Sequence, residues 1–135
     1  MADTLNLQVA TPERQLISQA VQQVELPGKN GHIGILPGHA PLLGMLGAGQ
    51  ITYSSGGETR PIVVSGGFIE VLNNEVRVLA ERAEFINEID AEQARRELSE
   101  AKKAVENLAP DANVEQALEK LNAAQARLDA VEHRK

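Results

Sequence analysis

The sequence predicts an α+β protein in which an N-terminal antiparallel β-sandwich is followed by a C-terminal antiparallel hairpin of two helices. The chain of 135 residues divides by composition. All 11 glycines lie before residue 68 and five of the six prolines lie before residue 62, whereas the residues after Asp90 contain no glycine and are rich in alanine. Glycine and proline punctuate short strands, and alanine favours helix. We therefore expect a sandwich domain over residues 1–86 and a helical hairpin over residues 87–135.

Seven short stretches in the first part alternate apolar and polar residues, with the period of a half-buried strand. These stretches are residues 5–9, 24–26, 33–35, 51–53, 62–64, 69–71 and 76–78. Turn signals lie between them at Pro27-Gly28, Gly56-Gly57 and Asn73-Asn74. Because no long helical pattern separates the stretches, we expect antiparallel pairing in a sandwich or flattened barrel rather than a parallel sheet.

The last third of the chain carries two amphipathic helical patterns. Asp90 with Gln93, and Asn113 with Gln116, are each typical of a helix N-terminus. Apolar stripes follow, with Ala91, Ala94, Leu98, Ala101, Val105 and Leu108 in the first and Val114, Ala117, Leu121, Ala124, Leu128 and Val131 in the second. Since alanine buries little apolar area, we expect the hairpin to be marginal alone and easily re-docked on another surface.

Composition and motifs exclude several classes of function. The formal charge of −6 and the three aromatic residues argue against nucleic-acid binding. The chain has no cysteine, no phosphate-binding loop and no catalytic motif, and no third ligand accompanies His32 and His39 at metal-binding spacing. No apolar run approaches the ~18 residues of a membrane span, and no signal peptide is recognisable. These observations predict a non-enzymatic interaction protein without a metal or cofactor.

Several segments carry a recognisable family pattern. Residues 31–42 have the sequence GHIGILPGHAPL, residues 65–71 SGGFIEV and residues 74–81 NEVRVLAE. Together with VATPER at residues 9–14, they resemble the sequence blocks of the epsilon subunit of F-type, proton-translocating ATP synthase, in the same order. The resemblance spans essentially the whole chain.

The resemblance implies a central-stalk (rotor) subunit that couples the c ring to the catalytic head with the gamma subunit, and that inhibits ATP hydrolysis through its C-terminal helices. Its partners would be gamma, the c ring, and the alpha and beta subunits of the head, and it would meet the membrane only through them. We therefore expect a peripheral protein on the cytoplasmic side of a bacterial inner membrane. The stromal side of a plastid thylakoid is the alternative, which the absence of a transit peptide disfavours.

The first family block supplies the expected contacts with the c ring or gamma. By match to that block, these residues are His32, Ile33, Gly38, His39, Ala40, Pro41 and Leu42. A loop rich in glycine and proline is stiff and loses little entropy on docking. The same residues can instead serve hairpin geometry alone, and the Ser65-Gly66-Gly67 segment is interpreted as a bend between strands.

An ATP-sensing hairpin is the alternative function. Some family members bind ATP through I/L-D-x-x-R-A at the start of the hairpin, aided by an upstream glutamate and distal arginines. Here Ile89 and Asp90 keep the pattern, but Gln93 replaces the arginine, while Glu84 and Arg127 match the upstream and distal positions. Because phosphate groups favour the planar cation of arginine, we expect ATP to be at most a weak regulatory ligand.

The C-terminal end of the second helix is the expected inhibitory arm. Its candidate residues are Arg127, His133, Arg134 and Lys135, which would enter an acidic environment in the catalytic head. The alternative is that these cations only complement the dipole at the helix C-terminus.

Overall fold

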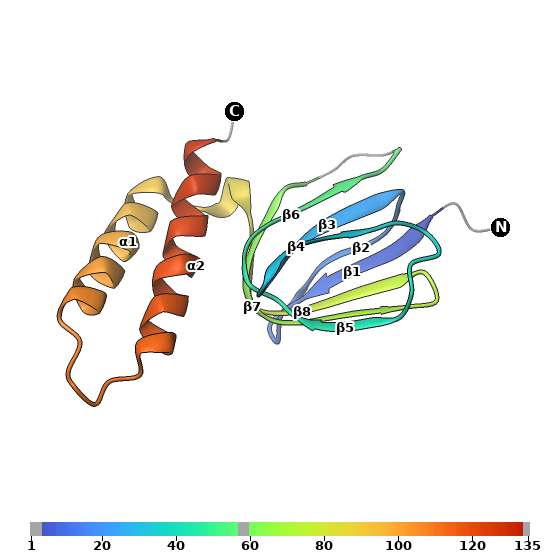
Figure 1. Cartoon of the computed structure of the whole chain (residues 1–135). Coiled ribbons are helices and arrows are strands. Elements are labelled where there is room, and N and C mark those ends of the chain that lie inside the picture. Colours follow the sequence, from blue (N-terminus) through green and yellow to red (C-terminus); the bar gives the residue numbers. More distant parts are fainter. Residues whose placement is uncertain (1–3, 57–59, 134–135) are drawn as a thin grey trace.

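The computed structural model describes residues 4–56 and 60–133, and it confirms the predicted fold class (Figure 1). A β-sandwich comes first, and two antiparallel helices pack against one end of it. The strands are β1 (Leu5–Ala10), β2 (Gln15–Val21), β3 (Gln23–Gly28), β4 (Gly31–Ile35), β5 (Leu42–Met45), β6 (Ala48–Ser54), β7 (Ile62–Leu72) and β8 (Glu75–Phe85). The 3₁₀ helix η1 (Ile86–Glu88) leads into α1 (Ala91–Glu106) and α2 (Val114–Glu132). The predicted domain boundary, between residues 86 and 87, falls inside η1.

The strands pair in the order β2-β1-β8-β7-β6-β3-β4, with β5 also on β7. All pairings are antiparallel except one among the described residues, because β1 lies parallel to β8, with Leu7 opposite Val76. Parallel neighbours need a long crossover, usually a helix. Here the six strands between β1 and β8 supply that crossover, so the sheet is mixed although no helix interrupts it.

Alternation along the strands directs one face of each into a common core. Leu5, Leu7 and Val9 of β1 are buried, whereas Asn6 and Gln8 between them are partly exposed. The largest fully buried side chains are Leu5, Leu7, Leu26, Ile35, Ile51, Ile62, Ile69, Val9, Val21, Val24, Val64 and Val71. The sandwich is therefore filled by branched aliphatic side chains from both layers.

Strand β7 unites two stretches that the sequence predicts as separate strands. The predicted bend at residues 65–67 lies inside this one strand, where Gly66 and Gly67 have φ of 71° and 119°. Before the bend β7 pairs with β6, and after it β7 pairs with β5. A Cβ on Gly67 would collide with the backbone of Leu79, so glycine is required at this close approach. The bend therefore allows β7 to pair with β6 along its first part and with β5 along its second part.

Both predicted helix N-caps are confirmed. The Asp90 carboxylate accepts hydrogen bonds from the backbone N–H groups of Glu92 and Gln93, at 2.9 and 3.2 Å, and Asn113 Oδ1 accepts one from Gln116 at 3.0 Å. Helix α2 lies between α1 and the sandwich and packs on β6 and β7 (Figure 1). Neither described helix is long and apolar enough to cross a membrane.

The junction at η1 is tied to the sandwich. Glu88 Oε1 accepts a hydrogen bond from the backbone N–H of Phe85 at 2.9 Å, and both Glu88 oxygens bind the Arg14 guanidinium at 2.7 and 3.1 Å. The guanidinium of Arg60 lies 3.6 Å from the centre of the Phe85 ring, within cation–π range. The segment through Glu88 is therefore tied to the sandwich, and Ile89, which is buried, leads from it into α1.

Candidate interaction surfaces

A cluster of ion pairs lies beneath the hairpin, around Arg127 of α2. The Arg127 side chain is 4% exposed, and its Nε and Nη2 donate to Glu84 Oε1 and Oε2 of β8 at 2.7 and 3.0 Å. Its Nη1 lies 2.9 Å from Glu97 Oε2 of α1, in an ion pair without an aligned hydrogen bond. Arg82 contacts the same two carboxylates at 3.2 and 3.4 Å. One buried guanidinium thus joins the sandwich to both helices.

The electrostatics of this cluster favour the charged arginine. Burial works against the charge on Arg127, but hydrogen bonding to Glu84 and the negative charges of Glu84 and Glu97 outweigh burial and raise its pKa. A buried ion pair contributes little net stability when complete, yet removing one partner is costly because the other is left uncompensated. The cluster therefore resists partial disruption while the hairpin is docked.

The residues matched to the ATP pattern have structural partners in this arrangement. Glu84 and Arg127 bind each other, and Ile89 is buried in the core between the hairpin and the sandwich. The carboxylate of Asp90 caps α1, and the backbone N–H groups of Gln93 and Glu92 lower its pKa. The structure brings these residues close to the hairpin base, but their polar groups are already engaged with one another or with backbone.

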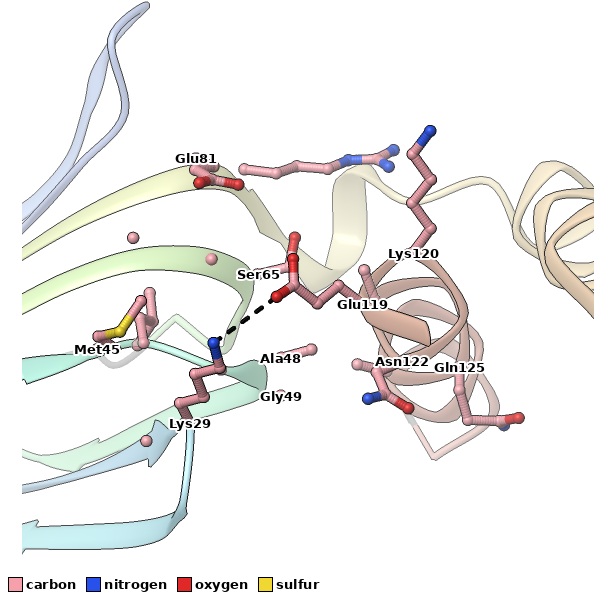
Figure 2. Close-up of a pocket in the computed structure, with 18 of the residues that line it drawn as sticks. Lys29, Met45, Ala48, Gly49, Ser65, Glu81, Glu119, Lys120, Asn122 and Gln125 are labelled. Carbon is pink, nitrogen blue, oxygen red and sulfur yellow. Dashed lines mark ion pairs between the residues drawn. The ribbon is translucent and has the colours of Figure 1, made fainter. Parts of the chain in front are cut away.

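The residues matched to the contact block separate in space. His32 and Ile33 lie at the start of β4, beside the turn at Lys29, whereas Gly38 lies beyond the end of β4. Lys29 pairs with Glu115 and Glu119 of α2 at 3.2 and 3.8 Å, which places the first group beside the hairpin (Figure 2). The predicted contact segment therefore has one part near the helices and another at the far end.

The far part is the turn that connects β4 to β5. Gly38 donates its backbone N–H to Asn74 Oδ1 in the β7–β8 turn, and that turn lies at the opposite end of β8 from the hairpin. His39 Nδ1 lies 2.6 Å from the carbonyl of Ala40. Ala40 and Pro41 are exposed and Leu42, the first residue of β5, is half-buried.

A groove runs between α2 and the sandwich (Figure 2). Its walls carry Lys29, Met45 and Gly49 on the sandwich side, and Glu119 and Asn122 on α2. Its volume of about 1390 Å³ exceeds the roughly 300–1,000 Å³ of small-molecule sites. We interpret it as the gap left between α2 and the sheet, which the Lys29 ion pairs cross.

An exposed apolar row, defined as Met45, Phe68 and Leu79, crosses three strands of the sandwich. Met45 pairs with Phe68, which pairs with Leu79, so the three side chains are cross-strand neighbours on the outer face. They are 51%, 58% and 62% exposed, and Leu43 on the same edge strand is 76% exposed. Contiguous exposed apolar side chains mark protein–protein interfaces. Sequence reasoning missed this row, although apolar residues at outward-facing strand positions were its signal.

The expected inhibitory arm is only partly described. Arg127 is buried in the ion-pair cluster, and His133 caps the end of α2, with its Nδ1 2.7 Å from the carbonyl of Asp129. Arg134 and Lys135 lie outside the described residues. In the docked hairpin, Arg127 is therefore turned away from any outside partner.

No group of three or more histidine, aspartate or glutamate side chains within residues 4–56 and 60–133 is arranged to hold a metal ion. The described surfaces present an apolar row, the turn between β4 and β5, and a hairpin held by ion pairs.

The sequence of this chain is similar to a known family profile and to known proteins over most of its length. Residues 4–86 match a family profile described as the beta-sandwich domain of the ATP synthase delta/epsilon chain. The chain is 48% identical over 128 residues to the ATP synthase epsilon chain of Solibacter usitatus, covering 95% of this chain and 96% of that one. It is 46% identical over 110 residues to the epsilon chain of Carboxydothermus hydrogenoformans, covering 82% of each.

Solved structures show the same fold. A chain in the mitochondrial ATP synthase of Euglena gracilis, an assembly of OSCP, F1 and c-ring, superposes with a TM-score of 0.80 at 25% identity, covering 98% of this chain and 84% of that one. A chain from the central stalk and c-ring of the Tetrahymena thermophila mitochondrial enzyme has a TM-score of 0.69 at 14% identity, covering 94% and 96%, and shares the fold.

Proposed function

The chain belongs to the family of ATP synthase epsilon chains, non-catalytic subunits of the central stalk, and we propose that it couples the c ring to the catalytic head together with gamma and restrains ATP hydrolysis through its C-terminal helices. It is associated with the membrane through the complex. We place it on the cytoplasmic side of a bacterial inner membrane, in keeping with its bacterial relatives.

The apolar row carries the docking part of this proposal. A row of exposed side chains across a rigid sheet presents a preformed surface, so little conformational entropy is lost on association. Large apolar and aromatic side chains dominate binding energy at such surfaces. We assign the row to gamma, and the exposed residues of the contact block, His32 to Leu42, to the c ring or to gamma.

The hairpin interface supports a two-state arm. Three of the nine buried residues in the apolar cluster that holds the hairpin are alanine, and the buried polar contact of the hairpin with the sandwich is the ion pair of Arg127 with Glu84. A conformational equilibrium needs a gap of only a few kcal/mol between its states. The hairpin can therefore dock on the sandwich or leave it while the sandwich stays folded and bound to the stalk.

Docking is tested by the double variant Phe68→Thr with Leu79→Thr. Threonine keeps strand propensity but removes most of the apolar surface. We expect gamma to co-purify with the natural chain. The double variant should bind gamma with an affinity lower by about tenfold or more, so that gamma no longer co-purifies. Val114→Thr is the matched control, because Val114 is an equally exposed apolar residue on α2. Equal gamma binding by the double variant and the control would exclude the row as the docking face.

Inhibition is tested in the assembled enzyme by two changes with opposite expected effects. Deleting residues 111–135 removes the arm and should raise ATP hydrolysis while leaving assembly intact. Glu84→Gln weakens the ion pair with Arg127 from the sandwich side, leaves the arm itself unchanged, and should lower ATP hydrolysis. Unchanged hydrolysis in the deletion variant would rule out inhibition by this arm.

The ATP-sensing alternative is disfavoured by the partners that Glu84 and Arg127 already have in each other. A nucleotide phosphate would have to displace a bidentate carboxylate from a buried guanidinium, and no arginine is present at position 93 to compensate. We therefore propose weak or absent ATP binding, and calorimetry that gave micromolar affinity would overturn this.

A further inference from the structure

The turn between β4 and β5 is tied to another turn of the sandwich by a backbone N–H that its own hydrogen bond does not use. Residues 36–39 form a β-turn in which the His39 N–H donates to the Leu36 carbonyl at 3.1 Å, with Pro37 second and Gly38 third at φ 87°. This is the pattern of a type II turn, which favours proline and glycine at those two positions. The turn's own hydrogen bond does not use the Gly38 N–H, which donates instead to Asn74 Oδ1 at 2.7 Å.

Asn74 joins three segments that are far apart in the sequence. It sits in the β7–β8 turn at φ 63°, in the left-handed region that asparagine tolerates better than most residues. Its carbonyl accepts a hydrogen bond from the Asn6 N–H at the start of β1, at 2.8 Å. Of its two side-chain polar atoms only Oδ1 accepts hydrogen bonds, so the Gly38 donor fixes how the amide is turned.

The bonded pair lies at the edge of the apolar outer face. Leu36 and Leu72, each two residues from one member of the pair, are 59% and 47% exposed. Strand β5 begins at Leu42, three residues after the end of the turn at His39, and carries Leu43 and Met45 on the face of the apolar row. The position of the turn therefore determines how the chain enters the edge of that face.

We propose that Asn74 is a positioning residue for gamma docking, which holds the turn at residues 36–39 and with it the entry to β5, so that Leu43 and Met45 stay aligned with the apolar row. This inference rests on the proposed function, in which gamma covers the row. Met45 of β5 is itself a member of the row and Leu43 lies on the same face of the same strand, so one partner that covers the row also covers this part of β5. A turn held in place before binding loses less entropy on association than a free one.

The test compares two variants of the full chain, Asn74→Gly and Asn74→Asp, in binding to purified gamma. Glycine removes the acceptor but keeps the positive φ, whereas aspartate retains an acceptor oxygen. For Asn74→Gly we expect gamma affinity to fall about fivefold, the equivalent of about 1 kcal/mol for one hydrogen bond, with faster hydrogen exchange of the Gly38 amide. Asn74→Asp should restore both quantities.

Two results would overturn the inference. The first is that Asn74→Gly binds gamma, and exchanges its Gly38 amide hydrogen, as the natural chain does. The second is that amide exchange becomes faster throughout β7 and β8, which would mean that Asn74 has a general structural role. The Phe68→Thr and Leu79→Thr pair separates this inference from the proposed function. If that pair weakens gamma binding while Asn74→Gly does not, only the positioning role fails; if the pair binds normally, gamma docking on the row itself fails.

Discussion

The sandwich and the hairpin are held by different kinds of contact. The sandwich core consists mostly of leucine, isoleucine and valine side chains, with Ala80, Ala83 and Phe85, and all of them are almost completely buried. The core between hairpin and sandwich contains Ala94, Ala124 and Ala130 among its nine buried residues and relies on one buried arginine. A branched side chain buries far more apolar area than alanine, so the free energy of docking the hairpin should be much smaller than that of folding the sandwich. One chain thus combines a sandwich with a large apolar core and a hairpin docked through a smaller one.

The largest expected effect is a cavity in the sandwich. Ile51→Ala removes a fully buried side chain of β6 and should lower the free energy of unfolding by about 4 kcal/mol, since the surrounding strands cannot collapse into the space. Denaturant unfolding measures this. A loss below about 1 kcal/mol would contradict the contrast between the two regions, because it would mean that the sandwich core is as loosely packed as the hairpin interface.

The second effect is confined to the arm. Arg127→Met keeps side-chain volume but leaves Glu84 and Glu97 with only the more exposed Arg82 as a common partner, which should cost up to about 3 kcal/mol of docking free energy. Hydrogen exchange should rise across α2 and stay unchanged in β1 and β8. Glu100→Gln is the control, because Glu100 is an exposed carboxylate on α1 outside the ion pairs. Equal exchange in both variants would show that apolar packing alone holds the hairpin.

A smaller effect is expected at the start of α1. Asp90→Ala removes the acceptor for two backbone N–H groups and should destabilise the first turn by about 1 kcal/mol. Exchange of the Glu92 and Gln93 amides measures it. Asp90→Asn, which retains an acceptor oxygen, should recover most of the loss. Failure of asparagine to do so would indicate that charge at the helix N-terminus matters more than the hydrogen bonds.

The smallest effect concerns the junction and depends on pH. The hydrogen bonds from Arg14 and from the Phe85 backbone lower the pKa of Glu88 from 4.5 to about 2. Because the folded pKa is the lower one, the stabilisation is fully present above about pH 4.5 and is lost as the pH falls towards 2. Both side chains are more than a third exposed, so the contribution is screened by solvent and by salt. Glu88→Gln should remove this pH dependence from the exchange of η1; an identical profile would contradict it.

The sequence pattern was sufficient to predict those strands in which apolar and polar residues alternate regularly, and those helices that begin with a capping residue. The alternation in β1 and the caps at Asp90 and Asn113 were predicted and confirmed. Strands β2 and β5 were missed, because β2 places Leu16 and Ile17 side by side and β5 turns Leu43 and Met45 outward. A strand with apolar residues on its exposed face does not alternate apolar and polar residues, and that alternation is the signal by which strands are predicted.

The candidate surfaces were harder to predict than the fold. Residues 32–42 are contiguous in sequence, but a strand within them separates His32 from His39. Arginine is seldom buried, so nothing in composition marked Arg127. Its spacing did carry a signal, since it lies three residues after Ala124 and four before Val131, on the same helix face as the apolar stripe.

The parallel pairing of β1 with β8 has a consequence for how the protein is made. Asn6 lies opposite Glu75, so the first strand cannot find one of its neighbours until almost the whole sandwich sequence has left the ribosome. Pairings between distant segments form slowly because the intervening loop must close first. Until then β1 can pair only with β2, and its other edge is open to neighbouring nascent chains. Synthesis of this subunit should therefore be most vulnerable to aggregation just before β8 emerges.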